Sequence, residues 1–205
     1  METTEENIIA DRLIENAMSY REYRELIDDL LEKGKTTGPK QSEKMTEYTR
    51  MNVQRMNRLD RQVELNDSLT QKLERLDEEW IWVVLTEGWC GDAAQNVPVI
   101  AKMANASENV EVKLILRDEH PEIMDQYLTN GTRSIPKLIC LDADSLEEIG
   151  TWGPRPEEAQ QMVYELKDKL EKKEWVQKLH KWYADDKGET IQSDFEELID
   201  KWSSS

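Results

Sequence analysis

An unbroken apolar stretch, Trp80 to Leu85, constrains the fold of this 205-residue chain more than any other feature. Its side chains are aromatic, β-branched or aliphatic, and the stretch is of strand length, so a strand is favoured over a helix. A strand with one face in water would alternate polar and apolar residues, and this stretch does not alternate. We therefore expect a central strand that is buried on both of its faces.

The residues after this stretch alternate between helix and strand patterns. Further strands are predicted at Glu111 to Leu116, Lys137 to Leu141 and Glu147 to Thr151, and helices at Asp92 to Met103 and Pro121 to Leu128. The composition of Asp142 to Ser145 is typical of a turn between the last two strands. A strand, a helix and a strand followed by a hairpin indicate an α/β fold, with a mixed sheet flanked by helices.

The N-terminal third has the apolar spacing of helices. Apolar residues recur from Ile9 through Ala17 to Leu31, which predicts one long first helix ended by Gly34 to Pro39. Ser42 and Asn66 are typical caps for a second and a third helix. We expect residues 1–77 to form an N-terminal helical extension and residues 78–170 to form the α/β domain.

The C-terminal third is predicted to be a helical tail over residues 171–205. Pro156 is suited to the start of the helix that precedes it. The apolar phase slips across Glu171 to Glu174, which predicts a bend or a change of packing partner there. Ser193 and Glu196 have the spacing of a capping box for a last short helix.

A net charge of −17 limits the partners of the chain. So acidic a surface repels nucleic acids and anionic membrane surfaces. The acidic N-terminus, Met1 to Glu6, lacks the basic start and apolar run of a secretory signal, and no apolar run is long enough to span a bilayer. Two cysteines are too few for a disulfide framework. We expect a cytoplasmic protein in a reducing compartment, without nucleic-acid or membrane partners.

Cys90 is the main candidate for chemistry, because it lies between the predicted central strand and the next helix. Free amide groups and the dipole at a helix start favour a thiolate, and such cysteines have pKa values of roughly 3.5–7.5 instead of ~8.5. Asp92 works against this by placing a like charge nearby. Position alone leaves both a reactive thiol and a buried structural cysteine open.

Three motifs occur around Cys90 in a recognisable order. They are Trp89-Cys90-Gly91-Asp92-Ala93 with Pro98 five residues after Ala93, Gly131 to Pro136 before a predicted strand, and Gly153 before a predicted helix. In these motifs residues 78–170 resemble the thioredoxin-like superfamily. The full strings Thr86 to Ala93 and Trp152 to Pro156 resemble a bacterial single-thiol branch of it, whose members are mostly uncharacterised.

The resemblance implies that Cys90 is the attacking thiol and that Pro136 is a cis proline, which leaves the backbone of Ile135 free to pair with an extended peptide. The binding residues that it implies are Trp89, Gly91, Asp92, Ala93, Ile135, Pro136 and Gly153. Ala93 stands where the family has its second redox cysteine, and Val84 stands where the family has a buried acid. Both differences fit a one-thiol mechanism and argue against dithiol reductase activity.

The leading hypothesis is a monothiol thiol–disulfide oxidoreductase, in which an external thiol resolves a mixed disulfide on Cys90. A non-catalytic binding module on the thioredoxin fold and a thiol redox sensor are the alternatives. The expected partners are a protein or a low-molecular-weight thiol or disulfide. No cofactor and no metal are expected.

The remaining candidates are weaker. Cys140 lies four residues beyond Pro136 on an extended strand, roughly 13 Å away, whereas a disulfide needs Cα atoms within about 7 Å. We therefore expect Cys140 to be a core residue. Arg117, Arg133 and Arg155 are candidates for holding an anionic substrate, although such arginines more often make structural pairs. His120 and His180 are expected to take no part, and with the cysteines they make no metal site.

Overall fold

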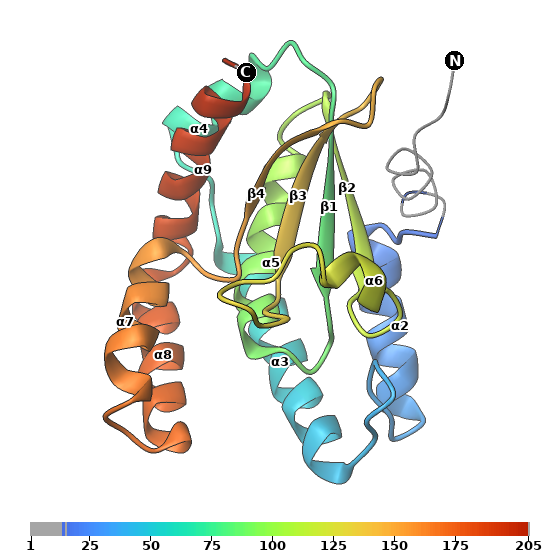
Figure 1. Ribbon diagram of the computed structural model, residues 1–205, viewed down its shortest axis with the longest axis vertical. Coiled ribbons are helices and arrows are strands. Elements are labelled where there is room, and N and C mark those ends of the chain that lie inside the picture. Colours follow the sequence, from blue (N-terminus) through green and yellow to red (C-terminus); the bar gives the residue numbers. More distant parts are fainter. Residues whose placement is uncertain (1–13, 15, 205) are drawn as a thin grey trace.

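The computed structural model describes Ile14 and residues 16–204 of the chain, and all elements below lie within that part. Four strands form one sheet in the order β2-β1-β3-β4. They are β1 (Trp80–Thr86), β2 (Val110–Leu116), β3 (Lys137–Asp142) and β4 (Glu148–Trp152). β1 is parallel to β2 and antiparallel to β3, and β4 is antiparallel to β3. This mixed sheet, flanked by helices, confirms the predicted α/β class (Figure 1).

β1 is the central strand that its composition predicts. All of its residues are buried, because it has a strand on each side and helices packed over the sheet. β2 lies at one edge of the sheet, and Met18 pairs with its residue Leu114 through two backbone hydrogen bonds of 2.7 and 2.8 Å. The segment before the first described helix therefore covers part of this edge.

The helices surround the sheet. They are α2 (Tyr20–Glu32), α3 (Glu43–Gln62), α4 (Asp67–Glu74), α5 (Gly91–Ala104), α6 (Pro121–Met124), α7 (Glu157–Lys167), α8 (Lys172–Asp186) and α9 (Glu189–Trp202). α3 packs against α5, α4 against α9, and α7 against α8 (Figure 1). None of the described helices is long and apolar enough to cross a membrane.

The first helix begins later than its apolar spacing predicts. Ile9 lies outside the described residues, and Ala17 precedes the helix instead of lying within it. Ser19 is the N-cap: its hydroxyl accepts a hydrogen bond from the Glu22 amide at 3.3 Å, and the Glu22 carboxylate accepts one from the Ser19 amide at 2.8 Å. This capping box starts α2 at Tyr20, and the extended backbone of Ser19 separates α2 from the residues before it.

Of two features predicted for the C-terminal helices, one is present in the structure and the other is not. The break near Glu171 is confirmed, because α7 ends at Lys167 and α8 begins at Lys172. The capping box of Ser193 and Glu196 is wrong, because α9 begins at Glu189, four residues earlier. Its first turn is satisfied instead by Asp186, whose carboxylate accepts hydrogen bonds from the amides of Gly188 and Thr190, both at 3.1 Å.

α6 is shorter than predicted and ends at Met124 instead of Leu128. The backbone tightens after it, because the amides of Gln126 and Tyr127 bond to carbonyls only three residues back, at 2.9 and 3.1 Å. Such bonds are typical of a tight turn at the end of a helix.

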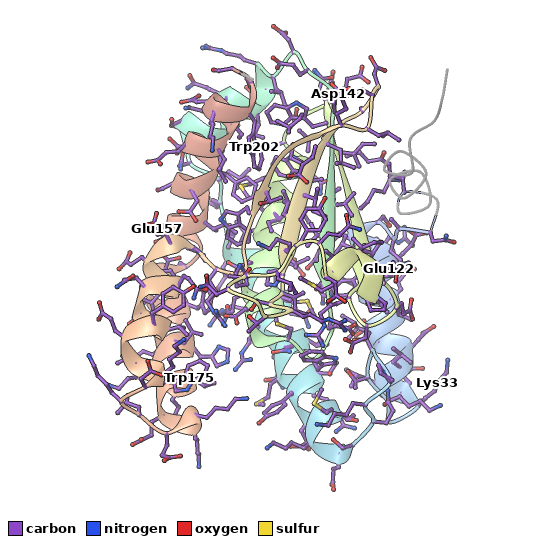
Figure 2. The ribbon with its side chains drawn as sticks, in the orientation of Figure 1. Lys33, Glu122, Asp142, Glu157, Trp175 and Trp202 are labelled. Carbon is purple, nitrogen blue, oxygen red and sulfur yellow. The ribbon has the colours of Figure 1, made fainter. Side chains whose placement is uncertain are left out.

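An aromatic cluster joins α9 to the sheet. Phe195 lies at the centre of the cluster, with ring centroids 5.1 Å from Trp82, 5.5 Å from Trp152 and 6.2 Å from Trp202. Phe195 and Trp82 are fully buried. Figure 2 shows Trp202, on α9, in the upper half of the molecule and Trp175, on α8, in the lower half. The main core thus extends from the sheet to α9.

Candidate functional site

Cys90 lies at the N-cap of α5, after the short loop that follows β1. Its Sγ is 3.3 Å from the carbonyl oxygen of Ile135, to which the thiol donates, and 3.5 Å from the amide nitrogen of Ala93, from which it accepts. Only 9% of the residue is exposed. The thiol is therefore held between a helix start and the backbone that precedes Pro136.

The three motifs around Cys90 meet in space. The Ile135–Pro136 peptide bond is cis, and so is the Gly153–Pro154 bond. Gly153 has a φ of +109°, and a Cβ atom there would lie 2.3 Å from the carbonyl oxygen of Pro136. Only glycine fits this approach, because a side chain would collide with backbone that cannot move aside. Cys90, Ile135, Pro136 and Gly153 are thus brought together.

Burial decides the ionisation of the Cys90 thiol. Burial and the neighbouring Asp92 carboxylate raise the pKa of Cys90 to about 12, although the amides of Ala93 and Asp92 act in the opposite direction. Of the two readings that the position of Cys90 leaves open, burial favours the structural one, because the cost of desolvating a thiolate outweighs the helix-start effect. Cys90 is a neutral thiol in this state.

Asp92 is the central residue of a polar network at the first turn of α5. Its carboxylate pairs with Arg155 at 2.6 Å and accepts a hydrogen bond from the Tyr183 hydroxyl at 3.0 Å. The Asn96 amide donates to the same hydroxyl at 3.0 Å and to the Asp92 carbonyl at 2.9 Å. Burial raises the pKa of Tyr183 well above its usual range, so it acts as a donor to Asp92.

His180 of α8 and Arg55 of α3 lie over Gly91. A Cβ atom on Gly91 would be 2.8 Å from Cε1 of His180 and 3.5 Å from a guanidinium nitrogen of Arg55. Burial, followed by the charges of Arg55 and Arg155, lowers the pKa of His180 to about 4. The imidazole is therefore neutral at pH 7, and it belongs to the Cys90 neighbourhood.

Sequence reasoning missed both His180 and Tyr183. Their spacing of three residues places them on one face of a helix, which was the available signal. The face that they contact belongs to α5, about ninety residues earlier in the chain, and nothing in the local pattern of α8 indicates that pairing.

The N-terminal helices cover the other side of the loop that leads to Cys90. The Gly88 amide donates to the Thr37 hydroxyl at 2.9 Å, and the Asn52 side chain donates to the Gly88 carbonyl at 2.9 Å. Ile27 of α2 packs against Gly88 so closely that a Cβ atom there would lie 3.1 Å from its side chain. The predicted extension therefore contacts the candidate site.

A buried acid precedes Cys90 in the chain, although not where the resemblance implies it. Val84 is apolar and fully buried, whereas Glu87, three residues before Cys90, is also fully buried. The Glu87 carboxylate accepts a hydrogen bond from the Asp118 amide at 2.9 Å, and burial raises its pKa.

The three arginines proposed for anion binding have different surroundings. Arg155 forms an ion pair with Asp92. Arg117 lies over the Trp89 ring, 4.8 Å from its centroid, and pairs with Asp118. Arg133 pairs with Asp125 at 2.6 Å on the surface. Only Arg155 among them contacts the first turn of α5.

The second cysteine lies apart from this site. Cys140 is fully buried in β3, opposite Trp82 of β1, which is the core position expected for it. Both cysteines are free thiols. Among the described residues no group of three His, Cys, Asp or Glu side chains could hold a metal ion.

Comparisons with known proteins bear on the fold and family. A family model described as thioredoxin matches residues 38–173. A search of curated proteins finds no match. A crystal structure of a protein of unknown function from Pseudomonas aeruginosa has a TM-score of 0.60 and 17% identity, over 92% of this chain and 95% of that one. An HIV epitope-scaffold has a TM-score of 0.54 and 18% identity, over 89% and 98%. Both structural likenesses show the fold alone.

Proposed function

This chain is a member of the thioredoxin family, and from that premise we propose that Cys90 carries out single-thiol exchange, with an external thiol as the resolving group. One observation carries the proposal. The Cys90 Sγ lies 3.3 Å from the Ile135 carbonyl oxygen, at the start of α5 and beside Pro136, where a bound disulfide would meet the sulfur. We assign Trp89, Gly91, Asp92, Ala93, Ile135, Pro136 and Gly153 to the surrounding binding surface.

The reaction has two exchange steps. Cys90 first loses its proton to solvent, and its thiolate attacks one sulfur of a disulfide in line with the S–S bond. A bond forms between Sγ and that sulfur, the old S–S bond breaks, and the other half leaves as a thiolate that takes up a proton. An external thiol then repeats the attack on the mixed disulfide and restores Cys90.

The surroundings of Cys90 leave no internal group for the second step. Ala93 is buried in the position next to Sγ and carries no sulfur. Cys140 lies inside the sheet, and its side chain is fully buried. The resolving thiol therefore comes from another molecule.

A small disulfide such as hydroxyethyl disulfide tests the proposal. The protein should gain one adduct, located on Cys90 by peptide mass mapping, and a thiol such as cysteine should remove it. Cys140→Ser should keep the adduct and Cys90→Ser should lose it. An unmodified Cys90 after prolonged exposure at pH 9 would contradict the proposal.

The Ala93→Cys variant tests the missing resolving group. The thiol introduced at this position should displace the bound half of the mixed disulfide and form an internal disulfide with Cys90, so the adduct becomes transient. Ala94→Cys is the matched control, because Ala94 is equally buried on the next position of α5. An adduct equally long-lived in Ala93→Cys and in the wild type would argue against this geometry.

A second candidate function is a non-catalytic module that binds an extended peptide beside Pro136. The burial of Cys90 and its pKa of about 12 favour it, because a neutral thiol is a poor nucleophile. Peptides selected for binding by display should then bind Cys90→Ser as tightly as the wild type. Loss of binding in Cys90→Ser together with adduct formation in the wild type would favour exchange.

The proposal fits a cytoplasmic protein whose partner is a protein or a low-molecular-weight thiol or disulfide. Reducing thiols are abundant in that compartment and would serve the second step. We keep residues 1–77, 78–170 and 171–205 as the proposed extension, thioredoxin-like domain and helical tail.

A further inference from the structure

We propose that Arg55, Arg155 and His180 form a subsite that binds the carboxylate of a small thiol or disulfide while its sulfur reacts at Cys90. The inference rests on the proposed exchange reaction and names its substrate class, low-molecular-weight compounds that carry a carboxylate close to their sulfur.

The three side chains converge from separate elements on the residue next to Cys90. Arg55 comes from α3, His180 from α8, and Arg155 from the loop before α7. A point one bond from the Gly91 Cα lies within 3.5 Å of both the Arg55 guanidinium and the His180 ring. Arg155 reaches the same turn through Asp92, at 2.6 Å. A ligand at Cys90 would therefore lie beside all three.

The positive charges around Gly91 outnumber the carboxylates that are bonded to them. Asp92 is the only carboxylate bonded to these side chains in the described part of the chain, and it is already shared by Arg155 and Tyr183. Among the described residues, Arg55 donates only to the neutral Asn52 side chain, at 2.7 Å. Within the same part of the chain, Arg58, one turn further along α3, donates only to Gln95, at 3.3 Å. Together with Arg58, the cluster brings three guanidinium groups to this region and bonds one carboxylate, in a chain with 44 acidic and 27 basic residues.

Such an arrangement is unfavourable without an anion. Arg55 is half-buried, and its burial together with the charge of Arg58 lowers its pKa. Like charges held near each other and away from water cost free energy, which a bound anion would recover. The neutral His180 ring can add a hydrogen bond to the same anion without adding to the repulsion.

The burial of Cys90 and the net charge of the protein favour a small carboxylate over a larger anion. A net charge of −17 repels polyanions over long distances, whereas a single carboxylate needs only the local surplus of cations. Cys90 is only 9% exposed, so a short ligand reaches it with less rearrangement than a folded protein would. An acidic peptide shares the same chemistry, and the test separates it by size.

Three small disulfides that differ mainly in charge test the inference. They are 3,3′-dithiodipropionate, which is anionic, hydroxyethyl disulfide, which is neutral, and cystamine, which is cationic. The rate of adduct formation on Cys90 is followed by intact mass at pH 8 and low salt, and each rate is divided by the rate for the protein unfolded in urea. The anionic probe should exceed the cationic one by about tenfold. The acidity of the whole protein would produce the opposite order.

Variants locate the preference. Arg55→Gln should reduce the ratio of anionic to cationic rates severalfold, and Arg55→Lys should keep part of it. Arg61→Gln is the matched control, because Arg61 is an exposed residue at the end of the same helix and its loss changes the net charge equally. It should leave the ratio unchanged. Circular dichroism checks that each variant is folded.

The outcomes separate this inference from the proposed function. Failure of all three probes to modify Cys90 overturns the exchange reaction itself. Modification by all three at similar normalised rates, or a ratio that Arg61→Gln lowers as much as Arg55→Gln, overturns the subsite and leaves the reaction standing. An acidic disulfide-linked peptide that reacts faster than dithiodipropionate would overturn the assignment to small compounds.

Discussion

α8 and α9 follow each other in the chain, yet they dock on the molecule in opposite ways (Figure 1). α9 buries Phe195, Ile199 and Trp202 in the main core beside the sheet. α8 buries Leu179 and Tyr183 in a small separate cluster with α7. Towards the body of the protein α8 turns polar atoms, and these contact the turn that carries Cys90.

The difference separates two roles within one helical tail. Apolar packing is insensitive to charge and contributes mainly to stability, whereas hydrogen bonds and ion pairs respond to pH and to single charge changes. We infer that α9 stabilises the fold and that α8 sets the environment of Cys90. Four predictions test this comparison.

The largest effect is expected for Phe195→Ala. Phe195 is fully buried among three indole rings, so its removal should lower the free energy of unfolding by about 3–5 kcal/mol. Urea denaturation followed by fluorescence measures this. Trp182→Ala, in the partly buried edge of the α7–α8 cluster, should cost clearly less. Equal costs for the two variants would remove the distinction between the helices.

The next effect concerns the reactivity of Cys90 towards iodoacetamide. Because its pKa is about 12, the rate should rise about tenfold per pH unit from pH 8 to pH 10, without a plateau. Asp92→Asn removes the like charge and should lower the pKa of Cys90, so the rate at pH 8 should rise by about tenfold. Asp185→Asn, on the exposed face of α8, is the control for net charge. A plateau near pH 8 in the wild type would contradict the buried neutral thiol.

Tyr183→Phe should have a smaller effect on stability. The change removes the hydrogen bond to Asp92 and the one from Asn96, both of 3.0 Å, and should cost about 1–2 kcal/mol. Chemical denaturation measures it, with Tyr164→Phe as the partner variant, since Tyr164 is exposed on α7. If both variants lose the same stability, the hydroxyl of Tyr183 has no special part in docking α8.

The smallest effect is the titration of His180. Its ring protons, followed by NMR and assigned with His120→Gln, should titrate with a pKa of about 4. Because the pKa is lowered on folding, the neutral ring contributes stability above the unfolded value of about 6.5, and this is lost as pH falls towards 4. His180→Gln should remove that part of the pH dependence. A midpoint near 6.5 would place the ring in solvent, away from Arg55 and Arg155.

Much of the fold is encoded locally and could be predicted. β1 follows from an uninterrupted apolar run, and Ser42 and Asn66 cap α3 and α4 with their own side chains, as their positions predict. One local prediction failed because a neighbouring residue takes the role instead. Ser193 has the spacing of a cap, but Asp186 already satisfies the first turn of α9.

The site was only partly predictable, because contacts between elements far apart in the chain decide part of it. The order of the motifs around Cys90, Pro136 and Gly153 is visible along the chain, and the structure brings them together. The pKa of Cys90 is not visible there, because it depends on how deeply the folded chain buries the thiol. The packing of α8 likewise brings Tyr183 to Asp92 and His180 to Gly91.

The pairing of Met18 with Leu114 has a consequence for self-association. An open sheet edge offers unpaired backbone groups to a strand of a second molecule. The two hydrogen bonds of Met18 use those groups of β2 at one position, so a neighbouring copy would have to displace this residue to lengthen the sheet there. The short segment ahead of α2 thus hinders edge-to-edge association of two molecules at this position of β2.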